Sequence, residues 1–62
     1  MKRLEFLKYL AKHNCVVAGE GGRHTYLQNT ANGNRTVIGR HRELDNDMAR
    51  LICKQLGVPP MR

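Results

Sequence analysis

Residues 24–39, HTYLQNTANGNRTVIG, decide the fold of this 62-residue chain. His24 to Gln28 alternates as a strand does, with His24, Tyr26 and Gln28 on one face and Thr25 and Leu27 on the other. Asn29 to Asn34 is a run of turn formers around an Asn-Gly pair, and Arg35 to Gly39 is again typical of a strand. The stretch therefore predicts an antiparallel hairpin.

The residues before the hairpin predict a helix and a strand. From Leu4 to Lys12 the apolar residues fall within one arc at 100° per residue, which is typical of an amphipathic helix. His13-Asn14 ends this helix, and the apolar run Cys15 to Ala18 favours a first strand. We expect the glycines of the turn at Gly19 to Gly22 to stop that strand.

A second helix follows the hairpin. Asp45 is placed to cap its amino terminus, and the helix runs to Leu56 before Gly57 ends it. Its expected buried face has Ala49 and Cys53 at one border and consists of Leu44, Met48, Leu51, Ile52 and Leu56.

The predicted order is α-β-β-β-α, an α+β fold in one domain over residues 1–62. We expect a three-stranded antiparallel sheet with both helices on one face. The other face stays open and carries His24, Tyr26 and nearby arginines.

Length and charge limit the function. A chain of this size has no room for a large substrate pocket beside its core, so we expect any active site at the surface. Eleven Lys and Arg against five Asp and Glu give a formal charge of +6 and a pI near 10.0. The natural partners are polyanions, and RNA, DNA, an acidic membrane and an acidic protein remain open on this count.

The chain has no expected export signal. Glu5, Lys8 and Lys12 interrupt the first helix, which therefore lacks the apolar run of a signal peptide and the length of a transmembrane segment. We expect a cytoplasmic protein without a membrane partner. Cys15 and Cys53 are too few for a disulfide framework and are interpreted as reduced, half-buried thiols.

His24 follows a glycine pair in the segment Gly21-Gly22-Arg23-His24, at the mouth of the second strand. Near neutral pH an imidazole exists in both protonation states, so it can take a proton from a ribose 2′-hydroxyl or give one to a departing 5′-oxygen. Charge that builds on the phosphate can be stabilised by backbone N–H groups of the glycines and by three arginines, Arg23, Arg40 and Arg42. An incidental surface histidine is the competing interpretation.

Two further residues keep two interpretations each. His41 is a second proton carrier or a phosphate contact, or else a solvated residue of the loop between Arg40 and Arg42. Tyr26 stacks on a base, or simply fills a half-exposed strand position. His13 ends a helix and receives no chemical role. Three histidines and two cysteines supply possible metal ligands, but none has the spacing of a structural zinc site, so we predict no metal and no cofactor.

Three segments together resemble the HicA toxin family: GGRHTY at 21–26, VIGRHREL at 37–44 and LICKQLGV at 51–58. The resemblance covers the chain from end to end. It implies a fold like the double-stranded RNA-binding domain and an endoribonuclease of a bacterial type II toxin-antitoxin pair, which cuts mRNA until a HicB-type antitoxin binds. The family's catalytic histidine matches His24, and its characteristic glycine matches Gly22.

Two positions depart from the family pattern, with Arg23 in place of a common serine and Gly39 in place of a common proline. We expect the first to change RNA contacts and the second to loosen the loop that carries His41. The sequence thus predicts a metal-independent ribonuclease with catalytic His24 and RNA contacts at Gly22, Arg23, Tyr26, Arg40, His41 and Arg42. A non-catalytic RNA-binding module is the alternative.

Overall fold

The computed structural model describes residues 1–61 and confirms the predicted order of elements. Its helices and strands are α1 (Arg3–Lys12), β1 (Cys15–Glu20), β2 (His24–Asn29), β3 (Arg35–Gly39) and α2 (Asn46–Leu56). The strands form one antiparallel sheet in the order β1-β2-β3, so β2 is central. This is the α+β fold that the periodicity predicts.

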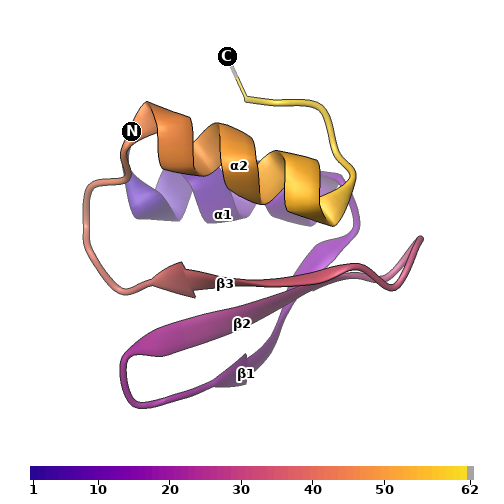
Figure 1. Ribbon diagram of the computed structural model, residues 1–62, viewed down its shortest axis with the longest axis horizontal. Helices are drawn as coiled ribbons and strands as arrows, with labels where there is room; N and C mark the ends of the chain where they lie inside the picture. Colours follow the sequence, from indigo (N-terminus) through magenta and orange to yellow (C-terminus); the bar gives the residue numbers. More distant parts are fainter. Residues whose placement is uncertain (62) are drawn as a thin grey trace.

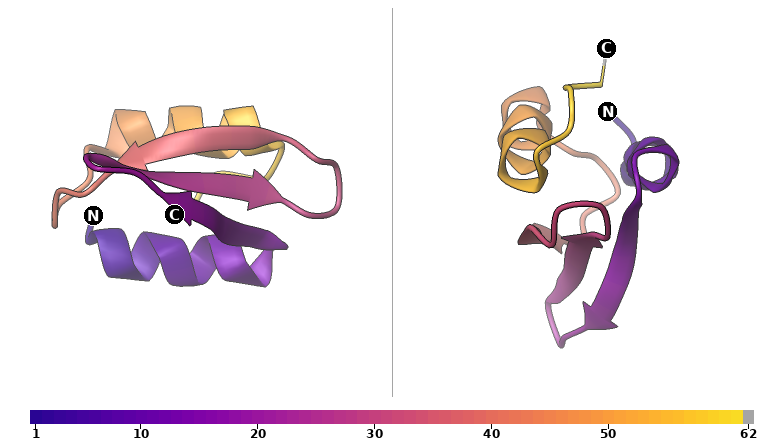
Figure 2. Two further views of the ribbon diagram at one scale, coloured as in Figure 1. Left: turned by 90° about the horizontal axis from the view of Figure 1, so that it is seen from below. Right: turned by 90° about the vertical axis from the view of Figure 1, so that its right-hand side faces the viewer.

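The two helices lie side by side over one face of the sheet (Figures 1 and 2). Helix α1 packs against β1 and α2 against β3. Phe6 and Leu10 come from α1, and Leu27 and Ile38 come from the sheet below them; all four are at most 2% exposed. The opposite face of the sheet has no helix over it, so its side chains meet solvent.

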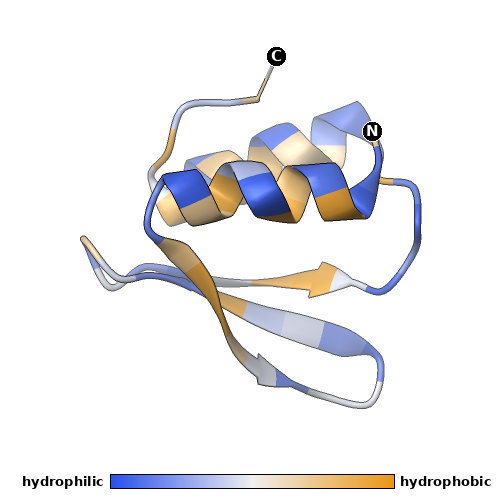
Figure 3. Cartoon of the chain, turned by 180° about the vertical axis from the view of Figure 1, so that it is seen from behind, coloured by the Kyte–Doolittle hydropathy of each residue, from blue (hydrophilic) through white to orange (hydrophobic). Residues whose placement is uncertain are grey.

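The alternation of β2 is confirmed from His24 to Leu27, whereas Gln28 is half-buried. Thr25 and Leu27 are buried under the helices, whereas His24 and Tyr26 are exposed on the other side. Figure 3 shows the apolar parts of the sheet at the start of β1 and near the end of β3, while the first residues of β2 are polar. The polar end of the central strand is therefore presented at the surface.

Strand β1 is longer than predicted. It continues through Gly19 to Glu20 instead of stopping at the glycine, and its register with β2 shifts between Val17 and Gly19. The expectation that glycine ends the strand was wrong because the irregularity absorbs the extra residue Ala18 and lets pairing resume.

The buried face of α2 is also rotated from the predicted one. Met48 and Leu51 are 50% and 46% exposed, whereas Ala49 and Cys53 are buried together with Ile52 and Leu56. The buried arc of α2 is therefore shifted from Met48 and Leu51 toward the smaller residues Ala49 and Cys53. Asp45 occupies the N-cap position, but its side chain makes no capping hydrogen bond.

The carboxyl end of α2 is tied to the hairpin turn. Gly57 adopts φ 75°, and the N–H of Val58 donates to the carbonyl of Cys53, which closes the helix. The carbonyl of Leu56, the last residue of α2, accepts hydrogen bonds from Asn29 Nδ2 at 2.8 Å and from Asn32 Nδ2 at 3.0 Å. Asn29 is 3% exposed and also accepts from the N–H of Ala31.

Replacing Asn29 by alanine is expected to lower the free energy of unfolding by about 2 kcal/mol, because it removes one buried and one partly buried hydrogen bond and leaves the backbone N–H of Ala31 without its acceptor. In a domain of this size that corresponds to a fall in Tm of about 10 °C. Thermal unfolding followed by circular dichroism measures both quantities. Asn32→Ala is the matched control, since Asn32 donates to the same carbonyl but is exposed, and its loss is expected to be less than half as large. If Asn29→Ala and Asn32→Ala lost equal free energy of unfolding, burial of Asn29 would not explain its effect.

Candidate active site

His24 opens β2, directly after the turn that joins it to β1. The N–H of Gly21 donates to the carbonyl of His24 at 2.8 Å and closes this turn. Across the ladder His24 pairs with Gly39, the last residue of β3. The histidine is therefore held by backbone contacts at the end of two strands, while its imidazole is exposed and makes no hydrogen bond within residues 1–61.

Gly21 and Gly22 differ in whether the surrounding residues leave space for a side chain. A Cβ on Gly21 would lie 3.1 Å from Cε2 of Tyr26, so the tyrosine ring packs where a side chain would be. A Cβ on Gly22 would meet no atom of residues 1–61 within 4 Å, and its φ lies outside the left-handed region. Packing therefore explains Gly21 but not Gly22, whose backbone is open to a ligand.

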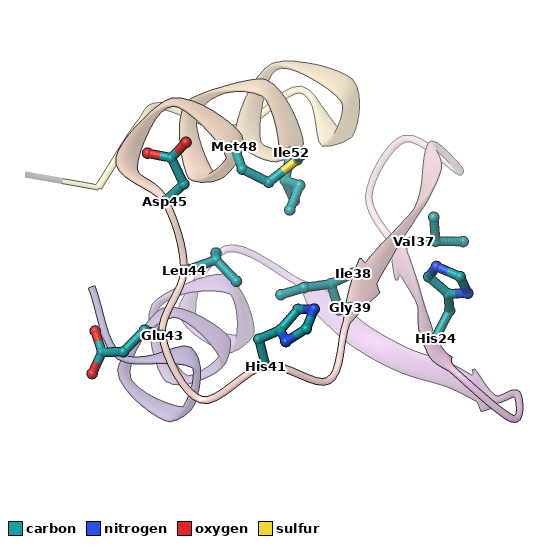
Figure 4. A pocket seen from close by; sticks show the side chains of 10 residues that line it. All are labelled: His24, Val37, Ile38, Gly39, His41, Glu43, Leu44, Asp45, Met48 and Ile52. Carbon is teal, nitrogen blue, oxygen red and sulfur yellow. The ribbon is translucent and has the colours of Figure 1, made fainter.

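His41 lies on the other side of Gly39 from His24 (Figure 4). Its Cδ2 is 3.4 Å from the position that a Cβ on Gly39 would occupy. The imidazole of His41 therefore lies at contact distance from the position of a side chain at residue 39.

Both histidines line one pocket of about 460 Å³ at the outer edge of β3. The opposite wall comes from the start of α2 and the loop before it, and the apolar lining is Val37, Ile38, Leu44, Met48 and Ile52. Glu43 and Asp45 also line it, so the pocket carries two carboxylates as well as the two histidines (Figure 4).

A second hollow beside the histidines is cationic. Its lining residues are Arg23, His24, Gly39, Arg40 and His41. Within residues 1–61 neither Arg23 nor Arg42 has a carboxylate partner, so both guanidinium groups face solvent. Arg42 lines a neighbouring hollow together with Lys2 and Arg3, so it is one step removed from the histidines.

Arg40 differs from the other two arginines because it is already paired. Its Nη2 donates to Glu20 Oε2 at 2.7 Å and to the carbonyl of Gly21. The side chain thus ties the end of β3 to the turn before His24. Its first role in this structure is to hold the turn, and a phosphate would have to compete with Glu20 for it.

Arg3 is a site residue that sequence reasoning missed. From the first turn of α1 its Nη2 donates to Thr25 Oγ1 at 2.8 Å and its Nε to the carbonyl of Gly39 at 3.2 Å. Thr25 is fully buried and follows His24 directly. The guanidinium therefore links the start of β2 to the end of β3, next to the two histidines. Its partners lie 22 and 36 residues away, so no local pattern marks it.

The amino terminus fixes the loop that carries His41. The N–H of Arg3 donates to the carbonyl of Arg42 at 2.8 Å, and the N–H of Leu44 donates to the carbonyl of Met1 at 2.7 Å. Lys2 and Glu43 lie opposite each other in this short bridge. The backbone of this loop is therefore hydrogen-bonded on the side facing α1, and the loosening expected from Gly39 stays a prediction.

Tyr26 lies two residues along β2 from His24 and is 48% exposed on the open face. Its neighbour across the ladder is Val37, and both line a shallow hollow with Gly19 and Arg35. The tyrosine is thus outside the pocket that holds the two histidines, and it extends the same surface along the sheet.

The cysteines take no part in this surface. Cys15 and Cys53 are free, and they are 3% and 1% exposed, so they are more deeply buried than expected. Burial raises the pKa of both thiols, which keeps them protonated and unreactive. Among residues 1–61 no three His, Cys, Asp or Glu side chains gather as metal ligands would. Neither helix has the length and apolar character that crossing a membrane requires.

Comparison with known proteins gives one informative match. No curated protein and no solved structure matches the chain. A family model described as the HicA toxin of bacterial toxin-antitoxin systems matches residues 4–58, from α1 to the residue after the glycine that ends α2. The match covers the three strands and α2 in full and all of α1 except Arg3, and it includes both His24 and His41. The chain therefore belongs to the HicA family and is a toxin of a bacterial toxin-antitoxin system, which implies an antitoxin as its partner.

Proposed function

We propose that this toxin is a metal-independent endoribonuclease that cuts mRNA in the bacterial cytoplasm, with His24 as its catalytic histidine. The observation that carries the proposal is the exposed imidazole at the end of β2, beside a glycine that packing does not require and an arginine with no carboxylate partner in residues 1–61. These groups surround an open space at the surface, as a long polyanion requires.

The chemistry follows from RNA itself. The ribose 2′-oxygen attacks the adjacent phosphorus, the bond from phosphorus to the 5′-oxygen breaks, and the products carry a 2′,3′-cyclic phosphate and a 5′-hydroxyl. His24 takes or gives one of the protons that this exchange moves. Negative charge on the phosphate is stabilised by Arg23, by Arg42 at longer range and by the backbone N–H of Gly22. Arg40 contributes indirectly, because it fixes the turn through Glu20.

The open face of the sheet extends the RNA contact. Two residues along a strand span about 7 Å, which is close to the spacing between nucleotides in an extended chain. This spacing supports a role for Tyr26 in stacking on a base next to the cleaved phosphate. Arg35 lies on the same hollow and supplies charge there.

We further propose that the antitoxin is of the HicB type and covers this surface. A net charge of +6 favours an acidic partner, and any protein laid across His24 and His41 excludes RNA. If an acidic, co-expressed antitoxin bound the chain and left RNA cleavage unchanged, inhibition by covering the site would be ruled out.

Cleavage of a labelled mRNA by the purified chain in EDTA tests the proposal. We expect the RNA to be cut and an all-deoxy copy of the same sequence to survive, because the deoxy copy lacks the attacking 2′-hydroxyl. The products should carry cyclic phosphate ends. Salt-sensitive binding without cutting, in a sample shown to be folded, would instead favour a non-catalytic RNA-binding module.

A further inference from the structure

We propose that His41 is the second proton carrier of the reaction, so that His24 and His41 form an acid-base pair across Gly39. The proposal rests on the ribonuclease activity proposed above. It replaces the interpretation of His41 as a solvated loop residue, and it supplies the second of the two proton transfers that the exchange needs.

The geometry of Gly39 carries the inference. Gly39 is the ladder partner of His24, and directly opposed residues have Cβ atoms about 5 Å apart. The imidazole of His41 lies against that same glycine, with Cδ2 3.4 Å and Nε2 4.0 Å from the position of its absent Cβ. Gly39 is therefore a common neighbour of both histidines, and both line the same two hollows, one of which Figure 4 shows.

His41 is held in place while its polar atoms stay available. The backbone on its carboxyl side is fixed by the bonds from Arg3 to Arg42 and from Leu44 to Met1, and Arg3 also holds the carbonyl of Gly39. Within residues 1–61 the imidazole of His41 makes no hydrogen bond. The backbone beside His41 is thus held, and the nitrogens of its exposed imidazole are available for proton exchange.

The charge around His41 argues against a phosphate contact as its main role. Arg23 and Arg42 already supply fixed positive charge beside the histidines. What these arginines cannot supply is proton exchange near neutral pH, since guanidinium groups stay protonated. The imidazole of His41 adds the proton exchange that the arginines lack.

The step balances with two imidazoles. One neutral imidazole takes the proton of the 2′-hydroxyl as the 2′-oxygen bonds to phosphorus. The other, as imidazolium, gives its proton to the 5′-oxygen as the bond from phosphorus to that oxygen breaks. No water or metal enters this transesterification, and the pair ends with the two protonation states exchanged.

Three variants test the pair in the full-length chain. His41→Ala is expected to reduce the cleavage rate about 100-fold, the usual scale for a positioned proton-transfer group. His41→Arg keeps a positive charge but exchanges no proton near neutral pH, so it is expected to lose about as much. His13→Ala is the matched control, because His13 stacks on Tyr9 at the far end of α1 and lines neither hollow. Its rate should stay within about 2-fold of the native rate.

A substrate with sulfur in place of the bridging 5′-oxygen separates acid from base. A thiolate leaves without protonation, so this substrate should restore cleavage by the variant that lacks the acid and not by the one that lacks the base. We expect exactly one of His24→Ala and His41→Ala to be restored to within about 10-fold of the native chain. We also expect the bell-shaped pH profile of the native rate to lose one limb in His41→Ala.

Two results would overturn the pairing while leaving the proposed function standing. If the native chain cuts RNA and His41→Ala cuts it at a rate within 3-fold of the native rate, His41 has no part in the chemistry. Recovery of the native rate by His41→Arg would make His41 a phosphate contact. Failure of the native chain to cut RNA at all would instead defeat the proposed function, so the two failures are distinguishable. Circular dichroism of each variant checks that it is folded.

Discussion

Alanine in place of His24 is expected to slow RNA cleavage about 100-fold or more, because it removes the proton-transfer group that stands exposed at the start of β2. This loss corresponds to about 2.7 kcal/mol of transition-state stabilisation. The measurement is the initial rate on a labelled mRNA in EDTA, with the native chain beside it. A substrate with a single deoxynucleotide on the 5′ side of the cleaved phosphate should be cut even more slowly, since it lacks the attacking 2′-hydroxyl.

Stability should not change with this substitution. The imidazole of His24 is exposed and makes no hydrogen bond within residues 1–61, so Tm is expected to stay within about 2 °C of the native value. His13→Ala again serves as the control for the loss of an imidazole elsewhere. In cells, expression of the native chain without its antitoxin should stop growth and expression of His24→Ala should not. Full cleavage by His24→Ala would remove His24 from the mechanism.

The fold could be predicted because its main signals are local. The alternation from His24 to Gln28 and the Asn-Gly turn fix the hairpin, and the structure confirms both. The predictions were wrong where contacts between distant residues override a local sequence signal. Gly19 remains in β1 because a register shift absorbs Ala18, and Met48 is half exposed because the buried face of α2 includes Ala49 and Cys53 instead.

The site could be predicted only in part. A glycine pair before a histidine marks His24, since both features are adjacent in the sequence. Nothing local reveals that His41 lies beside it, because their proximity depends on the pairing of His24 with Gly39. The pairing of Arg40 with Glu20 is likewise a contact across 20 residues, so a guanidinium that composition assigns to phosphate is engaged in the fold.

Arg3 carries the second large expected effect, because it links helix, sheet and site. Replacing Arg3 by leucine is expected to lower the free energy of unfolding by about 3 kcal/mol, since it removes two hydrogen bonds from a charged donor and leaves the hydroxyl of Thr25, which is fully buried, without its donor. Urea unfolding followed by circular dichroism measures the loss. At a temperature where the variant is folded, RNA cleavage is expected to fall about 10-fold, because the carbonyl of Gly39 is no longer held between the two histidines.

A double-mutant cycle separates the bond itself from general damage to the packing. Thr25→Val removes the acceptor, and the variant with both substitutions has no buried polar group left over at this position. The double variant is therefore expected to be at least about 1 kcal/mol more stable than the sum of the two single losses predicts. Strict additivity would mean that Arg3 and Thr25 act independently and that the bond between them contributes nothing. A positive coupling together with slow cleavage in both single variants would place Arg3 as the positioning residue behind the histidines, which neither its charge nor its place at the start of α1 indicates.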